Sequence, residues 1–169
     1  MKTTRALNVP GLTITEDFLT EEQEDFLIEK IDFEMNRERT PILRYGWGYN
    51  PADTWVQDIP DWLKYPKHQT FSGEECPFDS ISVHHYHAGR GIPPHIDSLA
   101  FGPEIYVLSL LGDSFLLMER GGAQEAFSIP RRSLYVMAGE ARELWEHAIE
   151  PVKSQRYSIV YRTKLTKPV

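Results

Sequence analysis

Cysteine is nearly absent from the sequence, and so are long apolar runs. The single thiol, Cys76, excludes a disulfide framework and any zinc module built on several thiolates. No apolar stretch approaches the roughly 20 residues that a membrane span needs, and residues 1–10 carry no apolar signal core. We therefore expect no membrane association and a cytoplasmic location, or a nuclear one in a eukaryotic cell.

An excess of basic residues is also missing, since 18 lysines and arginines stand against 25 acidic residues, for a net charge of −7. This balance argues against a protein that holds nucleic acid by bulk electrostatics, although a local basic patch is compatible with it. The 169 residues, 41% of them hydrophobic, suffice for one domain with its own core. We therefore expect a single domain over residues 1–169, with a monomer as the default state.

One segment near the N-terminus has a strongly helical pattern. A capping box, Thr20 with Gln23 three residues later, precedes apolar residues at helical spacing and predicts a helix over residues 20–33. Acidic residues gather at its start: Glu21, Glu22, Glu24 and Asp25. They suit the positive end of the helix dipole and need no functional explanation.

Most of the remaining chain has the texture of short strands separated by turns. Strands are predicted over residues 12–14, 16–19, 80–86, 105–111, 114–119, 126–129, 133–137 and 155–163. This length and spacing favour a sandwich or barrel over parallel β-α-β units. The predicted fold is mainly β with α cover, a double-sheet jelly roll whose N-terminal helix packs on one face.

Two histidines and an aspartate form a candidate metal site. His95 and Asp97 are two residues apart, so on an extended segment both side chains point to the same side. With a second imidazole from elsewhere, such as His147, they make up the donor set of non-haem Fe(II) oxygenases. A His-x-Asp pair alone is common by chance, so the assignment needs further support.

The strand near the C-terminus adds two arginines. Alternation places Arg156 and Arg162 on one face, opposite the face that carries Tyr157, Ile159 and Tyr161. Their Cα atoms are separated by roughly 20 Å, so two long side chains leaning inward would bracket a small dicarboxylate with the dimensions of 2-oxoglutarate. By the same alternation, His84 and Tyr86 of another predicted strand face this cavity.

Four ordered segments resemble the AlkB family of Fe(II)/2-oxoglutarate dioxygenases. They are residues 84–97, 130–134, 139–147 and 156–162, and the resemblance extends over residues 10–164. The sequence pattern is similar to that of the oxygenase domain of the tRNA-wobble-modifying AlkB homologues. The resemblance implies a double-stranded β-helix with iron held by His95, Asp97 and His147, and O2 as oxidant. It also implies that Arg156 and Tyr86 bind 2-oxoglutarate and that Arg162 lies near Asp97.

The chain departs from the family pattern at two positions. Where the family commonly has asparagine this chain has His84, so that contact with the co-substrate is altered or replaced. Two positions beyond the metal aspartate, the repair enzymes carry a second acid, and this chain has Leu99. The resemblance therefore does not extend to their specificity for 1-methyladenine and 3-methylcytosine.

Residues 36–70 are expected to form a substrate-recognition lid. Arginine and aromatic residues alternate here, with Arg44, Tyr45, Trp47 and Tyr49 as the candidates for contact with substrate. Such residues stack on a flipped or single-stranded base, but they also cover sheets as core or line peptide grooves.

The expected function is oxidative demethylation or hydroxylation of an alkylated nucleic-acid base, in RNA or DNA, with Fe(II), 2-oxoglutarate and O2. Oxidation or demethylation of a protein side chain is the first alternative, because the acidic composition and Leu99 weaken the case for a nucleotide. A catalytically silent binding module is the second.

Overall fold

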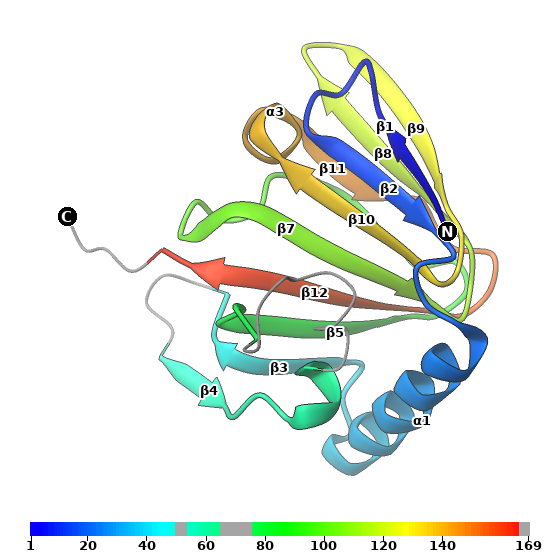
Figure 1. Ribbon diagram of the computed structural model, residues 1–169, viewed down its shortest axis with the longest axis vertical. Coiled ribbons are helices and arrows are strands. Elements are labelled where there is room, and N and C mark those ends of the chain that lie inside the picture. The colour runs from blue at the N-terminus through cyan, green and yellow to red at the C-terminus, as the bar shows by residue number, and fades with distance from the viewer. Residues whose placement is uncertain (50–53, 65–75, 166–169) are drawn as a thin grey trace.

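The computed structural model describes residues 1–49, 54–64 and 76–165 (Figure 1). Within these residues the helices are α1 (Glu21–Glu38), the 3-10 helix η1 (Asp61–Lys64) and α3 (Gly139–Glu143). The strands are β1 (Lys2–Arg5), β2 (Leu12–Glu16), β3 (Ile42–Trp47), β4 (Trp55–Gln57), β5 (Ser80–Tyr86), β6 (Ile92–His95), β7 (Phe101–Leu110), β8 (Ser114–Arg120), β9 (Ala123–Ile129), β10 (Ser133–Ala138), β11 (Glu146–Ile149) and β12 (Arg156–Lys164). None of the described helices is both long and apolar enough to cross a lipid bilayer.

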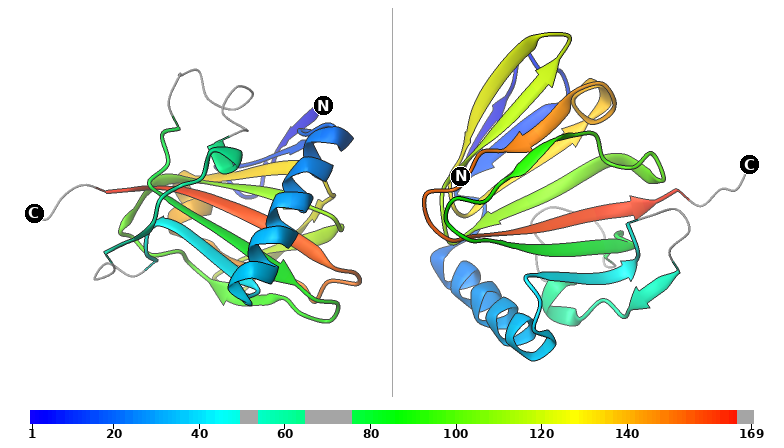
Figure 2. Two further views of the ribbon diagram at one scale, coloured as in Figure 1. Left: turned by 90° about the horizontal axis from the view of Figure 1, so that it is seen from below. Right: turned by 180° about the vertical axis from the view of Figure 1, so that it is seen from behind.

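The strands form two antiparallel sheets packed face to face (Figures 1 and 2). The large sheet has the order β1-β2-β10-β7-β12-β5-β3-β4, and the small sheet has the order β6-β11-β8-β9. β12, the last strand in the chain, lies in the middle of the large sheet between β7 and β5. The predicted fold class, a mainly β double-sheet jelly roll with an N-terminal helix on one face, is confirmed.

Seven of the eight predicted strands are found, as β2, β5, β7, β8, β9, β10 and β12; β5 has the predicted ends, and the ends of the others are displaced by up to four residues. The predicted strand over residues 16–19 is wrong, because β2 ends at Glu16 and Asp17 takes a left-handed conformation (φ 50°) that stops it. Strands β1, β3, β4, β6 and β11 were not expected. β6 contains Pro93 and Pro94. Proline in a sequence argues against a strand, because it has no backbone N–H to donate to a neighbouring strand.

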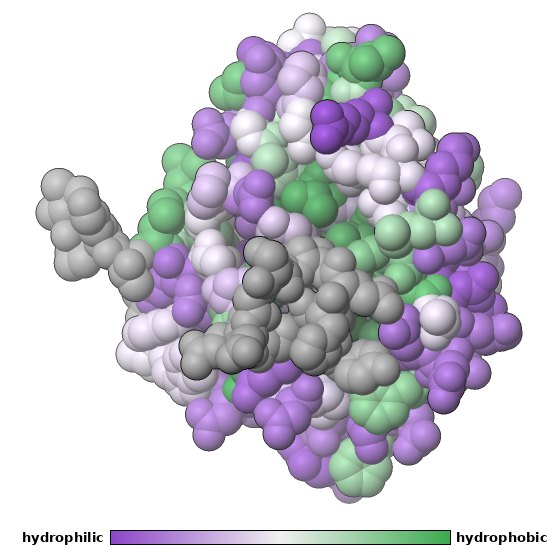
Figure 3. Space-filling model, viewed as in Figure 1, coloured by the Kyte–Doolittle hydropathy of each residue, from purple (hydrophilic) through white to green (hydrophobic). Residues whose placement is uncertain are grey.

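Helix α1 packs across the outer face of the large sheet (Figure 2). It begins at the predicted capping box, in which Gln23 N donates to Thr20 Oγ1 (3.2 Å) and Thr20 N donates to Gln23 Oε1 (2.9 Å). It ends at Glu38, five residues beyond the predicted end. Its buried side joins a core formed with the sheet, which includes Leu27, Ile31, Met35, Leu43, Val83, Leu108 and Ile159. Hydrophilic residues dominate its outer side (Figure 3).

A second core lies between the two sheets. It includes Ile105, Val107, Tyr135 and Met137 from the large sheet and Leu116, Met118 and Ile149 from the small sheet. Alternation along β12 sorts its side chains as predicted, because Tyr157, Ile159 and Tyr161 belong to the helix-side core and Val160 to the core between the sheets. The other residues on the Val160 face therefore point into the space between the sheets.

Candidate active site

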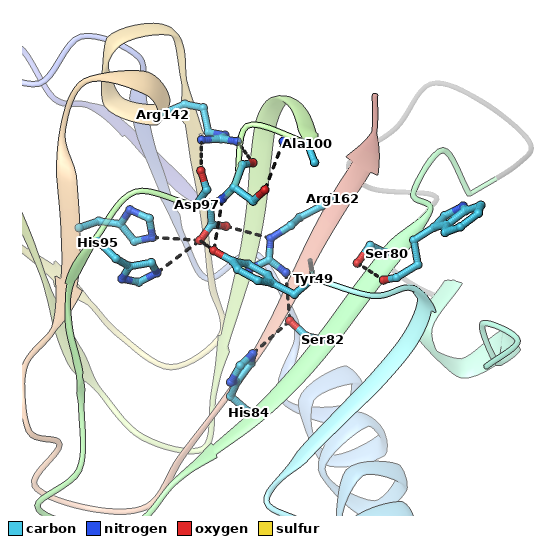
Figure 4. Close-up of polar contacts among 12 residues, drawn as sticks. Tyr49, Ser80, Ser82, His84, His95, Asp97, Ala100, Arg142 and Arg162 are labelled. Carbon is cyan, nitrogen blue, oxygen red and sulfur yellow. Dashed lines mark hydrogen bonds and ion pairs between the residues drawn. The ribbon is translucent and has the colours of Figure 1, made fainter. Parts of the chain in front are cut away.

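Three side chains with metal-ligand atoms converge between the sheets (Figure 4). Antiparallel pairing of β6 with β11 places His95 opposite His147, with ring centroids 4.2 Å apart. The Asp97 carboxylate reaches them from the segment that follows β6, and its Oδ1 lies 3.3 Å from His95 Nε2 and 3.8 Å from His147 Nε2. The ligand atoms all lie within 4.8 Å of one another. Two imidazoles and one carboxylate form the facial set used by non-haem iron.

The backbone around His95 presents one particular nitrogen to this cluster. Its Nδ1 lies 3.0 Å from the carbonyl oxygen of Pro93, and a carbonyl only accepts, so Nδ1 carries the proton. The other ring nitrogen, Nε2, faces Asp97 and is the one available to a metal. Gly91 allows β6 to approach β11 this closely, because a Cβ at that position would lie 2.2 Å from the carbonyl oxygen of Ile149.

The charges of the cluster suit a cation. Burial raises the pKa of Asp97, but the hydrogen bond with His95 and the charge of Arg162 outweigh it, so its pKa lies well below the usual range. Burial lowers the pKa of His147 to about 4, and His147 is therefore a neutral imidazole at pH 7. The hydrogen bond with Asp97 raises the pKa of His95, against the opposing effect of its burial.

Two buried arginines hold the segment that carries Asp97. Arg162 donates from Nε to Asp97 Oδ2 at 2.8 Å, so the predicted proximity of these two residues is present. Arg142 of α3 donates to the carbonyl oxygens of Asp97 (3.0 Å) and Ser98 (2.7 Å) (Figure 4). The guanidinium of Arg142 therefore fixes the backbone that carries the Asp97 carboxylate.

A cavity of about 320 Å³ opens beside the three metal-ligand residues. Its lining comes from both sheets and includes His84, Tyr86, His95, Asp97, Tyr135, His147, Ser158 and Arg162 together with apolar side chains such as Ile92, Ile105, Val107, Met137 and Val160. His84, Tyr86 and Arg162 thus share one cavity with the metal-ligand residues, as the strand alternation predicted. An apolar cavity with a few converging polar groups is the usual form of a small-molecule site.

Arg156 lies deeper than this cavity and is completely buried. Its Nε donates to Ser109 Oγ at 3.0 Å, whereas Nη1 and Nη2 make no hydrogen bond of good geometry to a described residue and have the Tyr86 and Tyr135 hydroxyls near them. Its guanidinium carbon lies 5.1 Å from the ring centroid of Tyr86, and the buried Ser158 Oγ lies beside the Tyr86 hydroxyl, also without a hydrogen bond of good geometry among the described residues. A buried cation with two unused donors is costly unless an anion completes it, and a carboxylate fits both donors at once.

His84 is joined to Arg162 through Ser82. Arg162 Nη1 lies 3.1 Å from Ser82 Oγ, which lies 3.1 Å from His84 Nε2. A guanidinium only donates, so the hydroxyl accepts from Arg162 and links it to the imidazole. Burial and the charges of Arg162 and Arg44 lower the pKa of His84 to about 4, so the ring is neutral at pH 7.

Three of the four residues predicted to contact substrate line the cavity: Arg44, Trp47 and Tyr49. The structure corrects the prediction for the fourth residue, Tyr45. Alternation along β3 places its side chain in the core under α1, where its ring packs edge-on against Trp62. Alternation alone would give Trp47 the same orientation. The register shifts after Gly46 (φ +72°), where a Cβ would lie 1.9 Å from the carbonyl oxygen of Asp79, and Trp47 faces the cavity instead.

Several residues of the site were not identified from the sequence. Lys164 places its Nζ 3.3 Å from the ring centroid of Trp47, which meets Trp55 edge-on. Lys164 is two residues after Arg162 on β12, so the alternation that identified the arginine also indicates the lysine. No comparable pattern indicates Ser82 or Tyr135, because their roles depend on which side chains lie across the cavity.

The chain was compared with protein families and with known proteins. Residues 35–166 match the family described as the 2OG-Fe(II) oxygenase superfamily. A Xenopus tropicalis protein named tRNA (carboxymethyluridine(34)-5-O)-methyltransferase alkbh8 is 33% identical over 161 residues, which cover 85% of this chain and 26% of that protein. An Arabidopsis thaliana protein, Alkylated DNA repair protein ALKBH8 homolog, is 26% identical over 85% of this chain and 51% of its own length.

A viral relative and a solved structure extend the comparison. Uncharacterized protein L905 of Acanthamoeba polyphaga mimivirus is 28% identical, with 90% of this chain and 79% of that protein covered. The structure of OsALKBH1 superposes with a TM-score of 0.69 at 11% identity over 96% of this chain and all of that one, which shows a shared fold. The chain spans about a quarter of the length of the vertebrate relatives it matches. On the family match and the three metal-ligand residues, this chain is an AlkB-like member of the 2OG-Fe(II) oxygenase superfamily, whose cofactors are Fe(II), 2-oxoglutarate and O2.

Proposed function

We propose that this chain oxidises an alkylated nucleic-acid base, with residues 1–169 acting as one oxygenase domain. Of the predicted substrate-recognition lid, residues 36–70, residues 50–53 and 65–70 lie outside the described residues, and residues 36–47 include the end of α1 and strand β3, so the lid is proposed for the described residues after β3. The observation that carries the proposal is the shared cavity, which has a His-Asp-His cluster beside it and a buried arginine with two unused donors behind it. These two features serve a metal ion and a carboxylate, which are the two partners that an Fe(II)/2-oxoglutarate enzyme brings together.

His95, Asp97 and His147 would hold the iron. The fit is chemical, since two imidazoles and an ionised carboxylate present their ligand atoms to one point, and His147 is already neutral. Iron with 2-oxoglutarate and O2 supplies the oxidising power that hydroxylates a C–H bond while 2-oxoglutarate becomes succinate and carbon dioxide. The chain orients the ligands through Arg162 and Arg142, which lock the carboxylate and its backbone.

Arg156 would bind the far carboxylate of 2-oxoglutarate. Its Nη1 and Nη2 are the unused donors, and Ser158 Oγ and the phenol of Tyr86 stand beside them. His84, neutral and hydrogen-bonded to Ser82, stands where the family commonly has asparagine, so a neutral imidazole would replace the amide in this contact with 2-oxoglutarate.

The residues at the mouth of the cavity favour a nucleic-acid base as the substrate. Trp47 and Tyr49 provide ring faces, and Arg44 and Lys164 provide positive charge in a chain whose net charge is −7. Recognition would then be local, by stacking and by a few cations. The Xenopus and Arabidopsis relatives, named for tRNA modification and for alkylated DNA repair, agree with this class.

Oxidation of a protein side chain is the second candidate. Leu99, beside the metal-ligand segment, is 72% exposed, and Ile96 is 38% exposed. An apolar rim of this kind suits a peptide substrate. The repair enzymes instead carry an acidic residue at the position of Leu99, two residues beyond the metal aspartate.

The first test is succinate formation from 2-oxoglutarate with Fe(II) and a methylated oligonucleotide. We expect His95→Ala and Arg156→Ala each to lower the rate by at least about 100-fold. Matched controls are His87→Ala and Arg120→Ala, which remove an exposed histidine and an exposed arginine that do not line the cavity. Full activity in both site variants would overturn the assignment, and a lack of turnover in the intact protein would indicate a catalytically silent module.

The second test identifies the substrate class, because an N-methyl group that is hydroxylated leaves as formaldehyde. Formaldehyde is measured with methylated single-stranded and double-stranded oligonucleotides and with methylated peptides. We expect release from an oligonucleotide and about a tenfold higher KM for Trp47→Ala, since stacking contributes roughly 1–3 kcal/mol per base. Release from the peptides alone would favour the protein-directed activity.

A further inference from the structure

The Tyr49 hydroxyl touches the metal-ligand segment rather than facing only the mouth of the cavity. Tyr49 follows the end of β3, and its hydroxyl lies 3.3 Å from Asp97 Oδ1 and 3.2 Å from the amide nitrogen of Ser98 (Figure 4). Oδ1 is the oxygen that faces both imidazoles of the cluster. A side chain 48 residues away in sequence therefore reaches the metal-facing atom of the aspartate.

The chemistry of these groups allows only one direction for this pair of hydrogen bonds. The Ser98 amide only donates, so the phenol oxygen accepts from it. An ionised carboxylate only accepts, so the phenol donates its own proton to Oδ1. A phenol keeps this proton at neutral pH. Tyr49 therefore ties the side chain of Asp97 to the backbone of the next residue.

The ring of Tyr49 is also held in place. Its centroid lies 5.6 Å from that of Phe101, and the guanidinium carbon of Arg162 lies 5.3 Å from it. Arg162 already binds Oδ2, and Arg142 binds the carbonyl oxygens of Asp97 and Ser98. Tyr49 supplies the contact that these arginines do not make, a donor on Oδ1.

We infer that Tyr49 is a positioning residue for the metal centre, whose phenol aims the metal-facing oxygen of Asp97. This inference rests on the proposed function in so far as Asp97 binds the metal. A carboxylate held by donors on both oxygens and through its backbone loses little rotational freedom when a cation binds. The site therefore binds the cation more tightly than it would with a freely rotating carboxylate. The Tyr49 hydroxyl would thus act on metal affinity without touching substrate.

The test is Tyr49→Phe, which removes the hydroxyl and keeps the ring on Phe101. Affinity for Mn(II) is measured by calorimetric titration of the metal-free protein. We expect three- to tenfold weaker binding, the magnitude of one net hydrogen bond. In turnover assays the Fe(II) concentration at half-maximal rate should rise by the same factor, and the absorption bands of the Co(II) form should shift.

Tyr157→Phe is the matched control. Its hydroxyl also donates to a carboxylate, that of Asp32, but on the outer face of the same sheet, so Mn(II) affinity should stay at the wild-type value. Equal or tighter Mn(II) binding by Tyr49→Phe, with an unchanged melting temperature of the metal-free protein, would overturn the inference. Asp97→Ala distinguishes failure of the inference about Tyr49 from failure of the proposed metal site. If this variant binds Mn(II) as well as wild type does, the proposed metal site itself is wrong.

Discussion

At the scale of single residues, burial decides which protonation state each site group adopts. His84 and His147 are both neutral because burial lowers their pKa to about 4, although imidazole is half-protonated near pH 6.5 in water. Asp97 is affected in the opposite sense, because its neighbours favour the charged form enough to overcome burial. The cavity therefore holds neutral imidazoles beside an ionised carboxylate, which is the state that a divalent cation requires.

The histidines predict a loss of stability in mild acid. Below pH 6.5 the unfolded chain binds a proton at His84 that the folded chain refuses until about pH 4, so stability falls as the pH falls through this window. For the metal-free protein we expect His84→Asn to remove about 1–2 kcal/mol of the loss between pH 7.5 and pH 5. Urea unfolding at both pH values checks this. Equal losses of unfolding free energy in wild type and variant would contradict this prediction. The part of the loss that comes from His147 should be the same in both proteins.

At the scale of elements, helix α1 is attached to the sheet by one buried carboxylate. Glu24 is completely buried, and its Oε2 accepts from Arg131 Nε (2.9 Å) and Nη2 (2.6 Å). Its Oε1 accepts from the amide nitrogen of Leu111 at 2.8 Å. The sequence shows four equivalent acidic residues at the start of this helix, and only the packing of α1 against the sheet singles out Glu24.

This attachment predicts unequal effects of removing acidic residues from the same helix. Glu24→Ala leaves Arg131 and the Leu111 amide without their partner, and we expect a loss of about 3–5 kcal/mol in the free energy of unfolding. Glu21→Ala, on the exposed side, should cost less than about 0.5 kcal/mol. Urea denaturation of both variants measures the difference, and similar losses in the two would contradict the role of Glu24.

At the scale of the whole molecule, the site is assembled from both sheets. His95 and His147 come from the small sheet, whereas Arg156 and Arg162 come from the central strand of the large sheet. Asp97 lies in the connection between β6 and β7, which leads from one sheet to the other. Ligands bound between the sheets therefore hold the two layers together.

Ligand binding is accordingly expected to raise the melting temperature. At about 100 times its dissociation constant, Mn(II) should stabilise the fold by about 2.7 kcal/mol, or roughly 5–10 °C, and 2-oxoglutarate should add to the effect. Differential scanning fluorimetry with and without a chelator measures the shift. Asp97→Ala should show none, and a shift of the same size in that variant would place the metal elsewhere.

The sequence by itself determined the local geometry of this protein. The two-residue spacing of His95 and Asp97, the faces of β12 and the capping box of α1 were all predicted correctly, because they depend on strand or helix periodicity within a few residues. The tertiary structure decided the pairing of β6 with β11, the burial of Glu24 and the contact between Tyr49 and Asp97. These join segments far apart in the chain, and their distances depend on how strands pair and layers pack, which local periodicity does not encode.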